Sequence, residues 1–266
     1  MNGKFDIVRL DWEERFGIAS LGGTTVRKSS SLIPGIFFTA VFYGIMLLLK
    51  LFGNGNVFIE MFFPGGEAGR TFIPAITVLA AMWAFSMLLI KCNKLAVQQK
   101  ALEILPGNGS RNEKLAFLEE NFEETGGLAA PELLKHRLEL ENKGLSEVEI
   151  TDLIDDAVND WEKASDSSFI FIGTLIWSIP VLGFTGTVLG LAKAVGNFGS
   201  LVKSDGLEAV LPQITGGLAT AFETTLIALV LALILQIFSS CCNQSELRFA
   251  ASLKKAVLSA ANKTQE

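Results

Sequence analysis

The sequence predicts an all-α integral membrane protein with four transmembrane helices and a helical cytoplasmic domain. Half of the 266 residues are hydrophobic and only 19% are charged, which is too apolar for an ordinary soluble domain. Four stretches contain the run of about 20 apolar residues that a helix needs to cross a hydrocarbon core of about 30 Å. These stretches are Ile33 to Leu51, Thr71 to Ile90, Phe169 to Val195, and Leu211 to Phe238.

The four stretches divide the chain into five expected segments. Residues 1–31 form an N-terminal segment, 32–91 hold the first and second transmembrane helices, and 92–168 form the helical domain. Residues 169–238 hold the third and fourth transmembrane helices, and 239–266 form a C-terminal tail.

Basic residues indicate which polar segments face the cytoplasm. The connection between the first two membrane stretches and the connection between the last two each hold one basic residue, Arg70 and Lys203. The other three polar regions are rich in Lys and Arg, so we expect both termini and the segment Lys91 to Ser168 in the cytoplasm. The first 31 residues lack the apolar core and cleavage site of a signal peptide.

The middle segment is expected to contain several helices. The stretch Pro106 to Ser110 and the pair Gly126-Gly127 predict turns, and Pro131 predicts the start of a helix. Ser146 followed by Glu149 predicts a capping box. The helix that follows the capping box has no stop signal before the third membrane stretch. It therefore either joins the cytoplasmic domain rigidly to the membrane or only packs in a core. Its expected apolar face is Ile150, Leu153, Ile154, Ala157, Val158 and Trp161.

Composition excludes several classes of function. The net charge of −6 arises largely in the middle segment, so nucleic-acid binding has no electrostatic support. His136 is the only histidine, and without a Cys/His cluster or nucleophile motif we expect a surface residue, no metal, no cofactor and no enzyme. Cys92, Cys241 and Cys242 lie at predicted cytoplasmic helix ends, where disulfides are disfavoured. We expect them to pack as small apolar residues, with lipidation or redox sensing as the alternative.

The third and fourth membrane stretches each carry one threonine in a stripe of small residues. A short connection makes the two helices antiparallel and brings Thr187 and Thr225 to similar depths, where hydroxyls hold water or a partly dehydrated cation. The alternative is helix packing, with each hydroxyl bonded to its own backbone. Thr187 shares its face with Pro180, Gly183, Gly190, Leu191 and Ala194, and Thr225 with Leu218, Ala221, Ala228, Leu229 and Ala232. The residues expected to pack the helices together are Gly183, Gly186, Gly190, Ala221 and Ala228.

Glu223 is the only acid within the fourth stretch. An ionisable group at membrane depth is costly, which suggests a function. Glu223 lies about 200° around the helix from Thr225, so the two are not expected to share a face. Lys193 lies about 9 Å outward of Thr187, and Glu223 about 3 Å outward of Thr225. A Lys193–Glu223 ion pair is therefore geometrically possible, and a proton relay through Glu223 is the alternative.

The stretch Leu182-Gly-Phe-Thr-Gly-Thr-Val-Leu-Gly190, followed by Ile214-Thr-Gly-Gly-Leu-Ala-Thr-Ala-Phe-Glu-Thr-Thr-Leu-Ile-Ala-Leu229, resembles the MotA/TolQ/ExbB proton-channel family. The resemblance is specific over about Pro180 to Phe238 and concerns only the order of segments elsewhere. Two membrane helices, a cytoplasmic domain and two more helices are closer to MotA than to TolQ or ExbB, which have three helices. The resemblance implies a homopentamer in a bacterial inner membrane around two copies of a single-span partner like MotB, TolR or ExbD. An intramembrane aspartate of that partner would bind the ion.

The resemblance also implies roles for four threonines. Thr187 and Thr225 match the pore threonines of the family. Thr220 stands where ExbB-like members carry a glutamate, and Glu223 lies three residues later, so an acid relay is not carried over directly. Thr224 stands where several proton-using members have a small apolar residue, and sodium-using members resemble this chain in having a threonine pair. The transported ion implied is H+ or Na+.

The function implied is the pore-forming subunit of an ion-driven motor, which couples cation flow to mechanical work through the partner. The alternative is a helical membrane scaffold or assembly subunit that does not conduct ions. A substrate transporter would favour internal symmetry between the two membrane halves, but the first pair of membrane stretches lacks threonine-bearing stripes. The sequence leaves open whether motility, outer-membrane transport, envelope maintenance or defence is driven.

Overall fold

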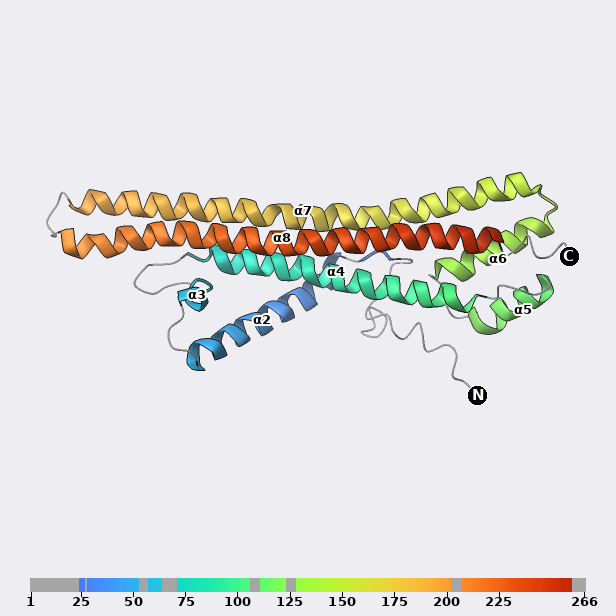
Figure 1. Ribbon diagram of the computed structural model, residues 1–266, viewed down its shortest axis with the longest axis horizontal. Helices are drawn as coiled ribbons and strands as arrows, with labels where there is room; N and C mark the ends of the chain where they lie inside the picture. The colour runs from blue at the N-terminus through green and yellow to red at the C-terminus, as the bar shows by residue number, and fades with distance from the viewer. Residues whose placement is uncertain are drawn as a thin grey trace. The chain divides into compact units, whose positions relative to one another are not determined.

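The described residues of the chain lie almost entirely in α-helices. The computed structural model describes residues 24–26, 28–52, 57–63, 71–105, 111–122, 128–201 and 207–259, and these ranges contain no strand. The turns expected at Pro106 to Ser110 and at Gly126-Gly127 lie outside these ranges. The helices are α2 (Lys28–Phe52), α3 (Val57–Glu60), α4 (Ile73–Ile104), α5 (Arg111–Phe122), α6 (Ala129–Asn142), α7 (Glu147–Leu201) and α8 (Leu207–Ser259) (Figure 1).

Four of these helices are long and apolar enough to cross a membrane. They are α2, α4, α7 and α8, and they contain the four stretches predicted from the sequence except Thr71 and Phe72, which precede α4. Helix α7 has 55 residues and α8 has 53, whereas a span needs about 20. Both helices therefore continue well beyond their apolar stretches, and the predicted continuity of the helix after Ser146 with the third membrane stretch is confirmed.

The chain divides into two compact units. Unit 1 contains Met1–Ser30, Leu88–Phe171 and Ser240–Glu266, and unit 2 contains Ser31–Met87 and Ile172–Ser239. Helices α4, α7 and α8 contribute residues to both units because each runs past the end of its apolar stretch.

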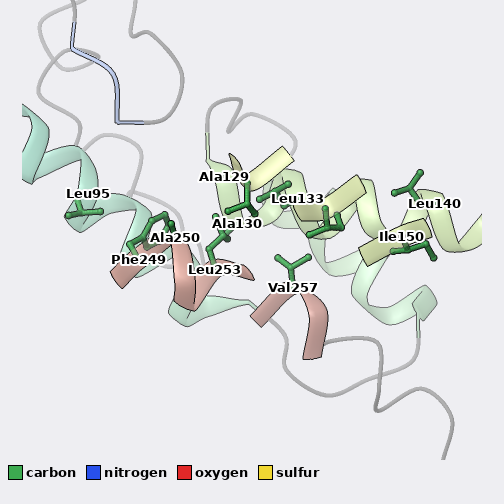
Figure 2. Packing of buried hydrophobic residues seen from close by; sticks show 12 residues of the cluster. Leu95, Ala129, Ala130, Leu133, Leu140, Ile150, Phe249, Ala250, Leu253 and Val257 are labelled. Atoms are coloured by element: carbon green, nitrogen blue, oxygen red, sulfur yellow. The ribbon is translucent and has the colours of Figure 1, made fainter. Parts of the chain in front are cut away.

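A core cluster of unit 1 is formed by side chains from α4, α6, α7 and α8 (Figure 2). Helix α7 contributes Ile150, Ile154 and Val158 at intervals of one turn, as the helical periodicity predicts. Ala157 and Trp161 pack at the margin of this cluster. Leu153, which the same pattern placed on the buried face, is 41% exposed, because the apolar face is narrower than expected. The other cluster residues are Leu95, Ala129, Ala130, Leu133, Leu140, Phe249, Ala250, Leu253 and Val257.

Polar side chains cap two helix starts in unit 1. The backbone N–H of Ser146 donates to Glu149 Oε2 at 2.9 Å, and the N–H of Glu149 donates to Ser146 Oγ at 3.4 Å. This reciprocal pair is the predicted capping box. Pro131 lies in the first turn of α6, as expected, and the N–H of Ala129 donates to Gln98 Oε1 of α4 at 3.0 Å. The exposed position of His136 on α6 is also confirmed.

In unit 2, α2 lies against the first part of α4. Trp83 Nε1 donates to Ser31 Oγ at 3.1 Å, and Ser86 Oγ donates to the Ser31 carbonyl at 2.7 Å. A side chain at Gly35 would place its Cβ 2.9 Å from the Cα of Trp83, so glycine is required for this approach. A small cluster of Phe62, Val78 and Ile227 joins α4 to α8 within the same unit.

Candidate ion site between α7 and α8

Helices α7 and α8 of unit 2 approach each other through small residues. A Cβ added to Gly190 would lie 2.7 Å from the Gly217 carbonyl oxygen and 2.8 Å from the Ala221 backbone nitrogen. A Cβ added to Gly217 would lie 2.9 Å from the Gly190 carbonyl oxygen. Real Cβ atoms essentially never come so close to backbone, so the absence of side chains at these positions sets the helix separation.

The same contacts give the register of the two helices. Gly183 faces Ala228, Gly186 faces the Thr224 side chain, and Gly190 faces Gly217 and Ala221. The numbers rise along α7 as they fall along α8, so the helices are antiparallel. Spacings of three or four residues on each helix keep this seam on one face. The seam contains the five residues expected to pack the helices together, and Gly217, which was not among them, also lies in it.

The threonine pair lies in the middle of the seam. The Thr187 and Thr225 hydroxyls form a short hydrogen bond with each other across the helix interface. Thr187 Oγ1 lies 3.2 Å from the Ala221 carbonyl oxygen, and Thr225 Oγ1 lies 3.1 Å from that of Gly183, so each hydroxyl also reaches the opposite helix. Both side chains are half-buried. The expectation that the two threonines lie at similar depth agrees with this contact.

Each hydroxyl also reaches a carbonyl of its own helix. Thr187 Oγ1 lies 3.3 Å from the Gly183 oxygen, and Thr225 Oγ1 lies 3.3 Å from the Ala221 oxygen. Four oxygen atoms therefore gather between two apolar helices, and the two that belong to hydroxyls carry one proton each. The protons can be donated in several alternative patterns, and oxygen lone pairs remain for a water molecule or a cation. The bonds within each helix agree equally with a packing role for the threonines.

The two other threonines of this region are buried on α8. Thr220 Oγ1 donates to the Gly216 carbonyl at 2.9 Å, and Thr224 Oγ1 donates to the Ala221 carbonyl at 3.1 Å. Thr224 also contacts the face of α7 at Gly186, so it belongs to the seam. The parts that Thr220 and Thr224 play in an ion path stay predictions.

Glu223 and Lys193 differ in their exposure. Glu223 is buried, whereas Lys193 is exposed on α7. Glu223 follows Phe222, which is exposed, and precedes Thr224, which is buried. The ion pair between Glu223 and Lys193 and the relay through Glu223 both stay predictions.

Sequence reasoning did not find a buried polar cluster in unit 1. Lys91 of α4 and Glu246 of α8 form an ion pair, with 2.9 Å between Lys91 Nζ and Glu246 Oε1, at exposures of 0% and 4%. Ser165 of α7 donates a short hydrogen bond to Glu246 Oε2, and its hydroxyl oxygen lies 3.0 Å from Lys91 Nζ. The Lys91 ammonium also lies 4.3 Å from the centre of the Phe169 ring, a favourable cation–π distance.

The chain just before α2 is bound to this cluster. The Thr24 hydroxyl donates to Ser165 Oγ at 3.1 Å, and the Val26 N–H donates to Ser168 Oγ at 3.3 Å. Lys94 Nζ donates to the Thr25 carbonyl at 2.7 Å. The sequence offered one signal for this pair. The basic residue Lys91 follows the second apolar stretch, and the acidic residue Glu246 follows the fourth. Among the described residues, no group of three or more His, Cys, Asp and Glu side chains is placed to hold a metal ion.

Part of the chain matches the model of a known protein family. Residues 126–254 match the model of the MotA/TolQ/ExbB proton channel family. The matched region extends beyond the stretch that carried the sequence resemblance, and it takes in α6, all of α7 and most of α8. No curated protein and no solved structure matches the chain. The four apolar helices make the chain a multi-pass membrane protein, and its residues 126–254, just under half of the chain, are similar to the MotA/TolQ/ExbB proton channel family.

Proposed function

We propose that this chain is the pore-forming subunit of an ion-driven motor of the bacterial inner membrane. The contact between the Thr187 and Thr225 hydroxyls is the observation that carries the proposal. It gathers four oxygen atoms at the interface of two helices that are otherwise lined with small apolar groups. A site of this kind offers a partly dehydrated cation or a water molecule the ligands that the hydrocarbon core lacks.

The threonines need an acidic group from elsewhere. A hydroxyl does not ionise near neutral pH, so Thr187 and Thr225 can orient water and accept a cation but cannot alone load and release protons. In the proposed complex, a single-span partner supplies an intramembrane aspartate, and five copies of this chain surround two copies of it. Neutralising that aspartate changes its preferred contacts with the threonines, and the resulting movement couples ion flow to work.

The proposed orientation places both termini and the polar middle segment in the cytoplasm. It rests on the basic residues, which are concentrated in those three regions.

Each elementary charge that crosses 100 mV releases about 2.3 kcal/mol, so a few ions are sufficient to drive a transition between packed states. The family is one of channel and motor subunits, and we propose no enzymatic activity and no cofactor.

Ion flux across liposomes tests the proposal. The complex purified from the host membrane is reconstituted, a membrane potential is imposed, and proton entry is followed with a trapped pH-sensitive dye. Thr187→Val and Thr225→Val keep the side-chain shape but remove the hydroxyl. We expect each variant to lower the flux at least tenfold, while native mass spectrometry shows an unchanged assembly. Repeating the assay with and without Na+ identifies the ion.

Thr185→Val is the matched control. Thr185 lies on the same helix, is exposed, and donates its hydroxyl to the Val181 carbonyl of its own helix at 2.9 Å. Its substitution removes the same chemical group away from the seam, and the flux is expected to stay at the wild-type value. Unchanged flux in the Thr187 and Thr225 variants would show that the ions follow a path without these hydroxyls, and absence of flux through the wild-type complex would favour the non-conducting scaffold.

A further inference from the structure

Two cysteines from different helices meet in unit 1. Cys92 of α4 and Cys242 of α8 have their Sγ atoms 3.0 Å apart, although 150 positions separate them in the sequence. Both are free thiols, as is Cys241. We propose that Cys92 and Cys242 form a reversible disulfide, which fastens α4 to α8 when a hydroperoxide reaches the thiols. The proposal goes beyond the proposed function, because it requires no ion flow.

The backbone around the two thiols is held by independent contacts. Lys91, the neighbour of Cys92, forms the buried ion pair with Glu246, which lies one turn beyond Cys242 on α8. The two helices are therefore fixed against each other next to the sulfur atoms. A disulfide has an S–S length of about 2.05 Å, so bond formation requires the sulfur atoms to approach by only about 1 Å.

The exposure of the three thiols distinguishes their roles. Cys92 is half-buried and Cys242 is 3% exposed, so an oxidant reaches Cys92 first. Cys241 is exposed, but it is the next residue after Cys242, about 100° around α8. The side chain of Cys241 therefore points in a different direction, and it provides a built-in comparison within the same chain.

The reaction proceeds in two balanced steps. The Cys92 thiolate attacks one oxygen of a hydroperoxide, the O–O bond breaks, and Cys92 becomes a sulfenic acid while water or an alcohol leaves. Cys242 sulfur then attacks the Cys92 sulfur, its proton leaves with the displaced hydroxide as water, and the S–S bond forms. The pair of thiols loses two electrons to the hydroperoxide. A small dithiol or the cellular thiol pool reverses the reaction by thiol–disulfide exchange.

The experiment uses the purified full-length chain in detergent. The reduced protein is treated with hydrogen peroxide, remaining thiols are alkylated, and the peptides are analysed by mass spectrometry without reduction. We expect two of three thiols to be lost per chain, a peptide pair joining residues 92 and 242, and full recovery of the thiols with dithiothreitol. Cys241→Ser should give the same cross-link as the wild type, whereas Cys92→Ser and Cys242→Ala should give none.

Other outcomes overturn the proposal. A cross-link from Cys92 to Cys241, cross-links between chains, or oxidation of Cys92 to a sulfinic acid without a cross-link would each contradict it. Because the wild type and Cys241→Ser are decisive by themselves, a folding defect in Cys242→Ala does not weaken the test. In host cells quenched with acid and alkylated, the pair should be reduced before peroxide treatment and oxidised after it. A pair already oxidised in untreated cells would contradict a reversible switch.

Discussion

At the scale of single residues, the Lys91–Glu246 pair of unit 1 sets a large desolvation cost against a strong electrostatic attraction. Removing both charges from water is costly, and their attraction offsets that cost only when their remaining hydrogen-bonding groups also find partners. Ser165 serves both members of the pair, and the Thr24 carbonyl oxygen lies 3.5 Å from Lys91 Nζ. The cluster therefore specifies which faces of α4, α7 and α8 meet, because a different pairing would leave a buried charge alone.

Loss of one partner should be more damaging than loss of both. Lys91→Met leaves the Glu246 carboxylate buried, and we expect it to lower the free energy of unfolding by about 3–5 kcal/mol. Adding Glu246→Leu should recover a large part of that loss. The measurement is the unfolding midpoint of the purified protein in detergent.

The Lys163–Asp160 pair is the control for this prediction. Its nitrogen and oxygen are 3.0 Å apart, but the side chains are 76% and 77% exposed. Solvent screens such a pair, so Lys163→Met should change stability by less than about 1 kcal/mol. Equal effects of Lys91→Met and Lys163→Met would show that burial does not determine how much the Lys91–Glu246 pair contributes to the free energy of unfolding.

The residue scale also shows where sequence reasoning succeeds and fails. The depth match of Thr187 and Thr225 was predictable, because a short connection between antiparallel helices fixes it. The pairing of Lys91 with Glu246 was not, because charges at the ends of apolar stretches commonly extend to water along the membrane interface. Which charge turns inward depends on the register of α4 against α8, and the sequence does not contain that register in any local pattern.

At the scale of elements, the α7–α8 seam depends on the absence of side chains. Gly190→Ala would place a methyl group 2.7 Å from the Gly217 oxygen and 2.8 Å from the Ala221 nitrogen, and both of these are backbone atoms. The helices must separate to admit it. We expect a loss of about 1–3 kcal/mol, read as a lower unfolding midpoint in detergent.

Gly173→Ala is the matched control on the same helix. A Cβ at Gly173 meets nothing within 4 Å, so alanine should be neutral or should stabilise α7 by up to about 1 kcal/mol. If both alanine variants behave alike, helix propensity and not the close approach determines the effect.

Helix boundaries were predictable where local chemistry defines them. The capping box at Ser146 gave the start of α7 within one residue, and the lack of any later stop signal gave its continuity into the membrane stretch. The width of the buried face was not predictable, and Leu153 is the example. Periodicity gives the centre of an apolar face, but the neighbouring helices decide how far around the surface it extends.

At the scale of the whole molecule, the copy number of the complex is the main prediction. Native mass spectrometry of the complex purified from the host membrane should show five copies of this chain with two copies of a smaller partner. The partner should have one apolar segment with an aspartate in it. The number five comes from the family resemblance, because the structure of a single chain does not give the symmetry of an assembly.

A complex of another copy number, or one without such a partner, would contradict the motor proposal and favour the scaffold.

That the chain is a membrane protein, by contrast, was predictable without any known relative. Four apolar stretches of sufficient length in a chain with few charges are decisive by composition alone.

The seam of small residues also limits how α7 and α8 can move. A slip of one turn, about 5.4 Å, would separate the Thr187 and Thr225 hydroxyls. Rotation of either helix would drive side chains into the positions that Gly190 and Gly217 leave empty. We therefore expect the membrane parts of α7 and α8 to move together as one rigid pair. In the proposed motor, movement would then arise at the outer surfaces of this helix pair and not between its two helices.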